Sequence, residues 1–102
     1  MGSGKLIRDN IPAIIEAQGR NATFHILDDA EYSKELERKL DEEVQEFHSD
    51  RNLEELADIL EVVYALAEDL GCSKEQLLEA YKKKHAERGG FRGRIFLHNN
   101  GG

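Results

Sequence analysis

Apolar residues recur at helical spacing through most of the chain, and polar residues or glycines separate the apolar segments. The first segment predicts a helix that Asp9 or Asn10 can cap. Pro12 falls in its first turn, where a missing N–H costs nothing, and Gly19 suits its end. In residues 22–27 apolar and polar side chains alternate only poorly, and the segment is predicted to be short and extended.

A second, longer helix is predicted to begin at Asp28 or Asp29. Its expected length is about 19 residues, which lies within the usual range for globular proteins. Its apolar positions follow one another at spacings of four, four and three, which places them on a single face. These positions are Leu36, Leu40, Val44 and Phe47.

The third predicted helix is apolar on more than one side. Asn52 can cap it, with Glu55 completing a capping box, and Gly71 ends it. A domain of this length has few other helices to cover two apolar faces, so this helix predicts a subunit interface. One face comprises Leu53, Leu56, Ala57, Leu60, Val63, Tyr64, Ala67 and Leu70, and the other comprises Ile59, Val62 and Leu66.

A fourth helix is predicted from its capping residue Ser73, with Gln76 as capping-box partner, to the glycines that follow residue 88. Residues 91–97 predict an extended or short-strand segment. The fold class is therefore all-α: a helical hairpin or bundle of about four helices, completed by oligomerisation. One domain over residues 5–97 is expected, and residues 1–4 and 98–102 are predicted to be tag-derived or flexible ends.

The composition narrows the classes of partner. The chain has 102 residues, and 14 Lys and Arg against 21 Asp and Glu give a net charge of −7, which disfavours binding to a nucleic-acid polymer. Cys72 is the single cysteine, so an internal disulfide is excluded and a reducing compartment fits. No membrane span and no signal peptide are expected, so the sequence predicts a cytoplasmic protein without a membrane partner.

The most acidic stretch covers residues 42–58 and holds seven acids. Positions three and four apart share one helix face, so each half of the stretch directs its carboxylates one way. A polar break at residues 49–52 would let the chain reverse there and bring the two groups face to face. The acids concerned are Glu42, Glu43, Glu46, Glu55 and Asp58.

Carboxylates from two facing helices are ligands that Mg²⁺ prefers, together with water and substrate phosphates. Such a site suits phosphoryl chemistry, because the ion can hold phosphate oxygens and activate a water. The alternative is an ordinary solvated helix face, on which Glu55 serves only as a capping residue. A di-iron bundle is excluded, because Gln45 and Lys82 stand where Glu would have to precede His48 and His85.

Two basic groups accompany the acids. The last helix carries residues 82–84 and Arg88 near its end, followed by a glycine-rich segment. Cations there complement the helix dipole, and they can equally form a phosphate clamp. Lys5 and Arg8 form a smaller basic group. Taken alone, these two residues are typical of a solvated chain terminus.

The order of these motifs resembles a known family. Glu42-Glu43-x-x-Glu46 followed by Glu55-x-x-Asp58 is similar to the acidic signature of the MazG-like all-α nucleotide pyrophosphohydrolases. The opening K-L-I-R-D-N-I-P, the run L-E-E-L-A-D-I-L-E and the R-G-G-F that ends at residue 91 resemble the phosphoribosyl-ATP pyrophosphohydrolase-like branch. These segments are spread over most of residues 5–97, although the eight positions between Glu46 and Glu55 are fewer than in many members.

The resemblance implies Mg²⁺, with Mn²⁺ as an alternative, and hydrolysis of a nucleotide substrate. That substrate would be a nucleoside triphosphate-like molecule, either a house-cleaning target or phosphoribosyl-ATP, cleaved to a monophosphate and pyrophosphate. The metal ligands would be Glu43, Glu46, Glu55 and Asp58, and the chain would form a homodimer or homotetramer. We hypothesise Glu42 or Glu46 as the general base, and we expect Lys5, Arg8, Lys84 and Arg88 to bind the polyphosphate.

Two other functions fit the same residues. One is a non-catalytic helical module that binds a nucleotide or a protein partner, and the other is a structural oligomer whose acids only keep it in solution. The base and the sugar of a substrate are not determined by these motifs. Release of pyrophosphate and a change of melting temperature with Mg²⁺ separate the three hypotheses.

Overall fold

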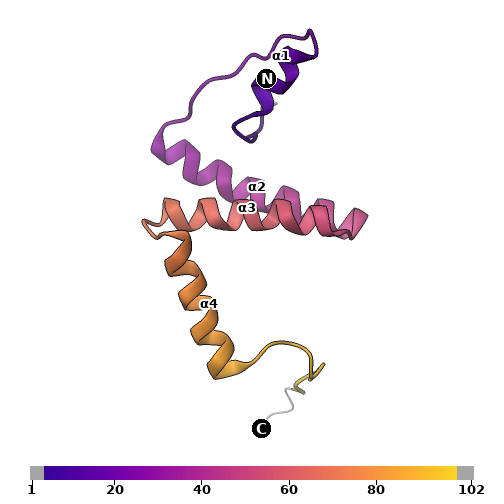
Figure 1. Ribbon diagram of the computed structural model, residues 1–102, viewed down its shortest axis with the longest axis vertical. Coiled ribbons are helices and arrows are strands. Elements are labelled where there is room, and N and C mark those ends of the chain that lie inside the picture. The colour runs from indigo at the N-terminus through magenta and orange to yellow at the C-terminus, as the bar shows by residue number, and fades with distance from the viewer. Residues whose placement is uncertain (1–3, 99–102) are drawn as a thin grey trace.

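The computed structural model describes residues 4–98, and this part of the chain is all-helical, with four helices and no strand. The predicted loose ends at residues 1–4 and 98–102 lie outside it, apart from Gly4 and His98. Figure 1 shows α2 and α3 side by side as a hairpin, with α1 on one side of it and α4 leaving it on the other. The helices are α1 (Ile11–Ala17), α2 (Asp29–Asp50), α3 (Leu53–Asp69) and α4 (Lys74–Arg88).

Capping residues fix where three of the helices begin. Asp28 and Ser73 form complete capping boxes at the starts of α2 and α4. Asn52 caps α3 by accepting a hydrogen bond from the Glu55 N–H at 3.0 Å. The capping box also predicted a hydrogen bond from the Asn52 N–H to the Glu55 side chain. Residues 4–98 do not contain this bond, so the Glu55 side chain is available for other contacts. Asn10 precedes α1 without a side-chain capping bond.

The turn between α2 and α3 is tight, because Arg51 and Asn52 alone connect the two helices. Arg51 adopts the left-handed conformation with φ of 46°, and its N–H donates to the Phe47 carbonyl at 2.8 Å. Its guanidinium also lies over the Phe47 ring, 5.4 Å from the centroid. The chain therefore reverses where the polar break predicted it.

The end of α3 is a Schellman motif, which sets the direction of α4. The Cys72 N–H donates to the Ala67 carbonyl and the Gly71 N–H donates to the Glu68 carbonyl, both at 2.9 Å. Gly71 has φ of 86°, a conformation that a side chain would strain. The helix thus ends where its glycine predicted, and α4 departs after a short connection.

Three local predictions need correction. The second helix has 22 residues and extends through Ser49 and Asp50, because neither residue breaks a helix and the left-handed Arg51 ends it. Residues 22–27 form no strand and are irregular, as are residues 91–97 beyond one turn. No strand lies within residues 4–98, so neither segment has a partner with which to form a sheet.

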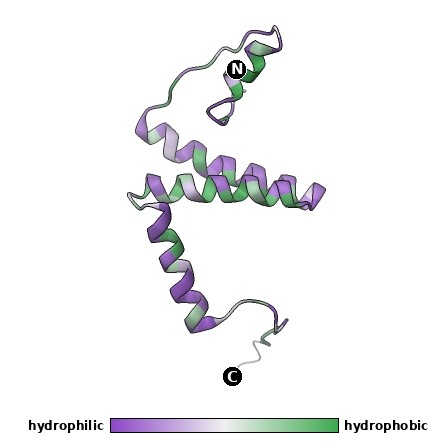
Figure 2. Cartoon of the chain, viewed as in Figure 1, coloured by the Kyte–Doolittle hydropathy of each residue, from purple (hydrophilic) through white to green (hydrophobic). Residues whose placement is uncertain are grey.

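The core of one copy is small. Within residues 4–98 its buried apolar residues are Leu36, Val62 and Ala67, on α2 and α3. The radius of gyration is 17.9 Å, whereas a compact domain of this length has about 13 Å. Figure 2 shows apolar positions spread along α3, while α4 is predominantly hydrophilic. Among the described helices, none combines the length and the hydropathy that a membrane span requires.

Much apolar surface therefore stays exposed. On α3 and α4, the outward-facing apolar side chains line a groove with an entirely apolar wall. The groove is lined by Leu60, Val63, Tyr64, Leu77, Leu78 and Tyr81.

Candidate metal and phosphate site

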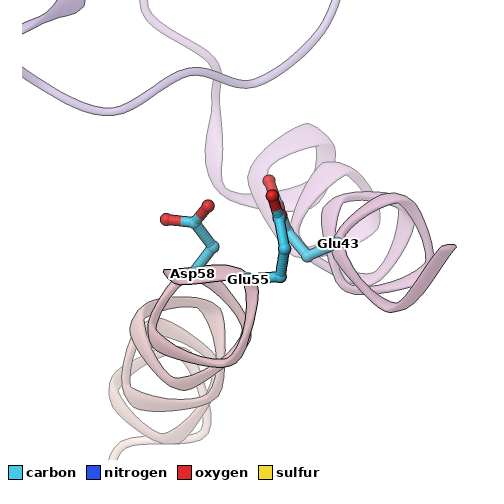
Figure 3. Close-up of side chains that lie close together, drawn as sticks. All are labelled: Glu43, Glu55 and Asp58. Atoms are coloured by element: carbon cyan, nitrogen blue, oxygen red, sulfur yellow. The ribbon is translucent and has the colours of Figure 1, made fainter. Parts of the chain in front are cut away.

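The hairpin of α2 and α3 brings acids from the two helices close together. Glu43 from α2 and Glu55 and Asp58 from α3 place one carboxylate oxygen each within 4.8 Å of one another. Figure 3 shows Glu43 and Glu55 converging from the two helices, with Asp58 directed to the same side. All three side chains are partly shielded from solvent. The predicted meeting of the two acidic halves is thus present within one chain.

A second, more exposed group adjoins the first through a shared residue. Glu46, Asp50 and Glu55 also place carboxylate oxygens within 4.8 Å of one another. Asp50 was not predicted here, because it was assigned to the polar break instead of the helix. Its spacing of four from Glu46 would have placed it on the same face, had the helix been extended by one turn.

Glu55 belongs to both acidic groups, and its pKa reflects that position. Slight desolvation and the neighbouring carboxylates, with Asp50 and Asp58 first among them, raise the pKa of Glu55 above its ordinary value. Several negative charges this close repel one another unless a proton or a cation intervenes. The neighbouring carboxylates therefore favour the protonated form of Glu55 more than an isolated glutamate would experience.

Glu42 occupies a different environment from Glu55. Its carboxylate contacts the Lys5 ammonium and the Lys39 ammonium, each at 3.4 Å. Desolvation alone would raise the pKa of Glu42, but the two lysines outweigh it and the net shift is downward. Lys39 also lies 3.4 Å from Glu43. Lys39 is not among the residues predicted for the site, although its i,i+3 and i,i+4 spacings to these acids are a signal that the sequence contains.

The N-terminal basic group lies against the acids. Arg8 donates from Nη1 to Asp58 Oδ1 at 2.7 Å and from Nη2 to Glu61 Oε1 at 3.4 Å. Lys5 reaches Glu42 at 3.4 Å. The segment before α1 thus supplies two cations to the acidic face of the hairpin, across more than 35 residues of sequence.

The C-terminal basic group lies elsewhere. Lys84 and Arg88 stand on the last turns of α4, which leaves the hairpin from the end of α3 remote from the turn (Figure 1). Within residues 4–98, no ion pair joins either side chain to the acidic cluster. One copy of the chain therefore brings together the acids and the N-terminal cations, but not the cations of α4.

Comparison with known proteins gives one partial likeness. The chain is 47% identical over 45 residues to an uncharacterized protein of Mycolicibacterium smegmatis. The matched segment covers 44% of this chain and 46% of that relative, so it spans less than half of each. No protein-family model matches the chain, and no solved structure matches it.

Proposed function

We propose that the protein is a Mg²⁺-dependent hydrolase that cleaves a nucleoside triphosphate-like substrate to a monophosphate and pyrophosphate. The observation that carries this proposal is the convergence of Glu43, Glu55 and Asp58 from two helices beside two cations of the N-terminal segment. Carboxylates that gather a cation, next to guanidinium and ammonium groups that gather phosphate, are the two halves of a nucleotide-hydrolysing site. The motif order that resembles the MazG-like family supports the same reaction.

The donor set fits Mg²⁺. Ligand distances of about 2.1 Å separate neighbouring ligand oxygens by about 3 Å and opposite ones by about 4.2 Å. The carboxylate oxygens of Glu43, Glu55 and Asp58 lie within 4.8 Å of one another, so small side-chain rotations suffice to enclose an ion. Glu46 would complete the set from the adjoining group. When bound there, Mg²⁺ or Mn²⁺ supplies charge neutralisation at the phosphate oxygens and a more acidic water.

The environments of the two candidate bases favour Glu46 over Glu42. A general base must release its ion pairs and accept a proton during the reaction. Glu42 is held by two lysines, which lower its pKa and weaken it as a base. Glu46 is exposed on the same face of α2, and the described structure gives it no ion pair. We assign the proton-accepting role to the carboxylate oxygen of Glu46 that is not a metal ligand, and a positioning role to Glu42.

A homo-oligomer is part of the proposal. The apolar groove of α3 and α4 and the large radius of gyration both indicate that one copy leaves apolar surface unburied. A second copy would cover that surface, and its α4 would offer Lys84 and Arg88 to the acids of its neighbour. The single cysteine and the reaction itself also favour a cytoplasmic location.

Pyrophosphate release with Mg²⁺ tests the proposed reaction. The panel comprises the standard and the chemically damaged nucleoside triphosphates together with phosphoribosyl-ATP. We expect at least one of them to yield pyrophosphate, and Glu46→Gln to lower that rate at least ~100-fold, as loss of a general base does. Glu54→Gln is the matched control, because Glu54 is an exposed acid of α3 outside both acidic groups.

Circular dichroism checks that Glu46→Gln keeps its helices. An unchanged rate in that variant, at saturating Mg²⁺, removes Glu46 from the reaction. Absence of pyrophosphate from every nucleotide of the panel favours the non-catalytic binding module instead.

A further inference from the structure

Arg8 connects the N-terminal segment to an acid of the candidate metal site. Its Nη1 lies 2.7 Å from Asp58 Oδ1, the shortest ion pair that the described residues contain. Its Nη2 lies 3.4 Å from Glu61, which stands outside both acidic groups. Arg8 therefore contacts one oxygen of Asp58 through Nη1. Through Nη2 it contacts the carboxylate of Glu61, which belongs to neither acidic group.

The same contact attaches α1 to the hairpin. Within residues 4–98, the side-chain hydrogen bonds that join the chain before α2 to the hairpin come from Lys5 and Arg8 alone. The α1 helix has seven residues, and isolated helices shorter than about 12 residues are marginal in water. Lys5 and Arg8 are thus the polar attachments of the N-terminal segment, which also lines a cavity with α2 and α3 through Leu6, Ile7 and Ile11.

We infer that Arg8 is an exchangeable counter-ion of Asp58, which a divalent cation displaces and which then binds a substrate phosphate. This inference rests on the proposed function. A guanidinium and a divalent cation repel each other and compete for one carboxylate, so each weakens the hold of the other on Asp58. The freed guanidinium keeps its contact with Glu61 beside the cluster, and its fork suits phosphate oxygens.

The exposure of the pair sets the size of the effect. The side chains of Arg8 and Asp58 are 55% and 37% exposed, so the pair is only partly shielded from water. Pairs of this kind change an equilibrium by about two- to fivefold. Removal of Arg8 should therefore tighten the binding of a divalent cation by about that factor. It should weaken the joint binding of cation and phosphate by more, because a charge-assisted bond to phosphate is lost.

Binding of Mn²⁺, followed by electron paramagnetic resonance at low ionic strength, tests the exchange. The proteins are the wild type, Arg8→Gln and the control Arg20→Gln. The control removes the same charge from an arginine whose side chain, within residues 4–98, bonds only the side chain of Gln18. We expect Arg8→Gln to bind Mn²⁺ about two- to fivefold more tightly than the wild type, and Arg20→Gln to match the wild type. In the presence of Mn²⁺, Arg8→Gln should bind pyrophosphate more weakly than both.

Unchanged or weaker Mn²⁺ binding by Arg8→Gln overturns the inference. A result in which Arg20→Gln tightens Mn²⁺ binding as much as Arg8→Gln also overturns it, because general charge and not the contact with Asp58 would then be the cause. Both measurements use the metal and inorganic pyrophosphate alone, so they can succeed even where no nucleotide is hydrolysed. Failure of the proposed reaction and failure of the exchange are therefore separate outcomes.

Amide hydrogen exchange in α1 gives a second readout, and its first comparison needs no metal. We expect Asp58→Asn to speed the exchange of residues 11–17 without any added metal, because the main attachment of Arg8 is lost. Saturating Mg²⁺ should speed the same amides in the wild type and have little further effect in Asp58→Asn. Equal protection of α1 in all of these samples contradicts the attachment.

Discussion

The two basic groups of this chain have similar residues and opposite placements. Lys5 and Arg8 lie on the acidic face of the hairpin, where each contacts a carboxylate of the candidate site or its border. Lys84 and Arg88 stand on α4, which leaves the hairpin from the end of α3 remote from the α2–α3 turn (Figure 1). The first group is completed by the fold of one chain. The second group can serve the acids only if another copy supplies it.

The packing of the helices explains the difference. α2 and α3 pack on each other through Leu36, Val62 and Ala67, and this small core fixes the acids and the cations that reach them. α4 has no buried residue, and its apolar side chains contribute to an open groove instead. A site made of both basic groups would therefore depend on two different interfaces, one within the chain and one between chains.

Complementation between variants gives the largest expected effect and tests the division directly. Asp58→Asn should lower pyrophosphate release at least ~100-fold, as loss of one preorganised charge contact does. Arg88→Gln should lower it about 10- to 100-fold, the range for a bond to a charged group. A mixed oligomer of the two variants should recover activity above that of either alone, because one intact cluster meets one intact α4. Steady-state pyrophosphate assays after mixing measure the recovery.

The control for that experiment mixes Asp58→Asn with Glu55→Gln. Both substitutions fall in the group of Glu43, Glu55 and Asp58, so no subunit of that mixture holds an intact set of acids. Recovery in the control, or none in the test mixture, would show that the α4 cations do not act across subunits.

Leu78→Asp should have the next largest effect, on assembly. Leu78 is 40% exposed in the apolar groove of α3 and α4. A charge buried against a second copy would raise the dissociation constant of the oligomer at least ~10-fold. Analytical ultracentrifugation should show smaller particles, while circular dichroism shows unchanged helices.

Ala80→Asp is the matched control for assembly, because Ala80 is exposed on the same helix but does not line the groove. Equal dissociation of both variants would mean that any charge on α4 disturbs the oligomer. An unaltered oligomer in Leu78→Asp would exclude the groove as its interface.

Lys5→Gln should have the smallest effect, on the pKa of Glu42. Lys5 and Lys39 together lower the pKa of Glu42, so loss of Lys5 should raise that pKa. Lys84→Gln should leave the Glu42 pKa unchanged in the dilute protein. A group with a lowered folded-state pKa adds stability above its unfolded pKa and loses it as pH falls through the folded value. The variant should therefore be less stable than the wild type at neutral pH, by up to about 1 kcal/mol for so exposed a pair.

The stability difference should vanish in acid, once Glu42 is protonated in both proteins. Carboxyl titrations by nuclear magnetic resonance and urea denaturation at several pH values measure the two quantities. An equal shift of the Glu42 pKa in Lys5→Gln and Lys84→Gln would contradict the contrast between the two groups.

Local signals in the sequence predict most of the helical framework. Asp28, Asn52 and Ser73 cap α2, α3 and α4 as their side chains suggest, and Gly71 ends α3. These signals are readable because a cap acts within four residues of itself. The extended segments were mispredicted for the opposite reason, since a strand needs a distant partner that no local pattern reveals.

The candidate site divides in the same way. Helical spacing and a polar break determined that the acids at residues 42–58 would face one another, because periodicity and reversal are local properties of the chain. Only the tertiary structure decided that Arg8 contacts Asp58 and Glu61, that Lys39 and Lys5 hold Glu42, and that α4 leaves the site. These placements depend on which surfaces pack across long stretches of sequence, and that balance of burial and charge is settled by the whole fold.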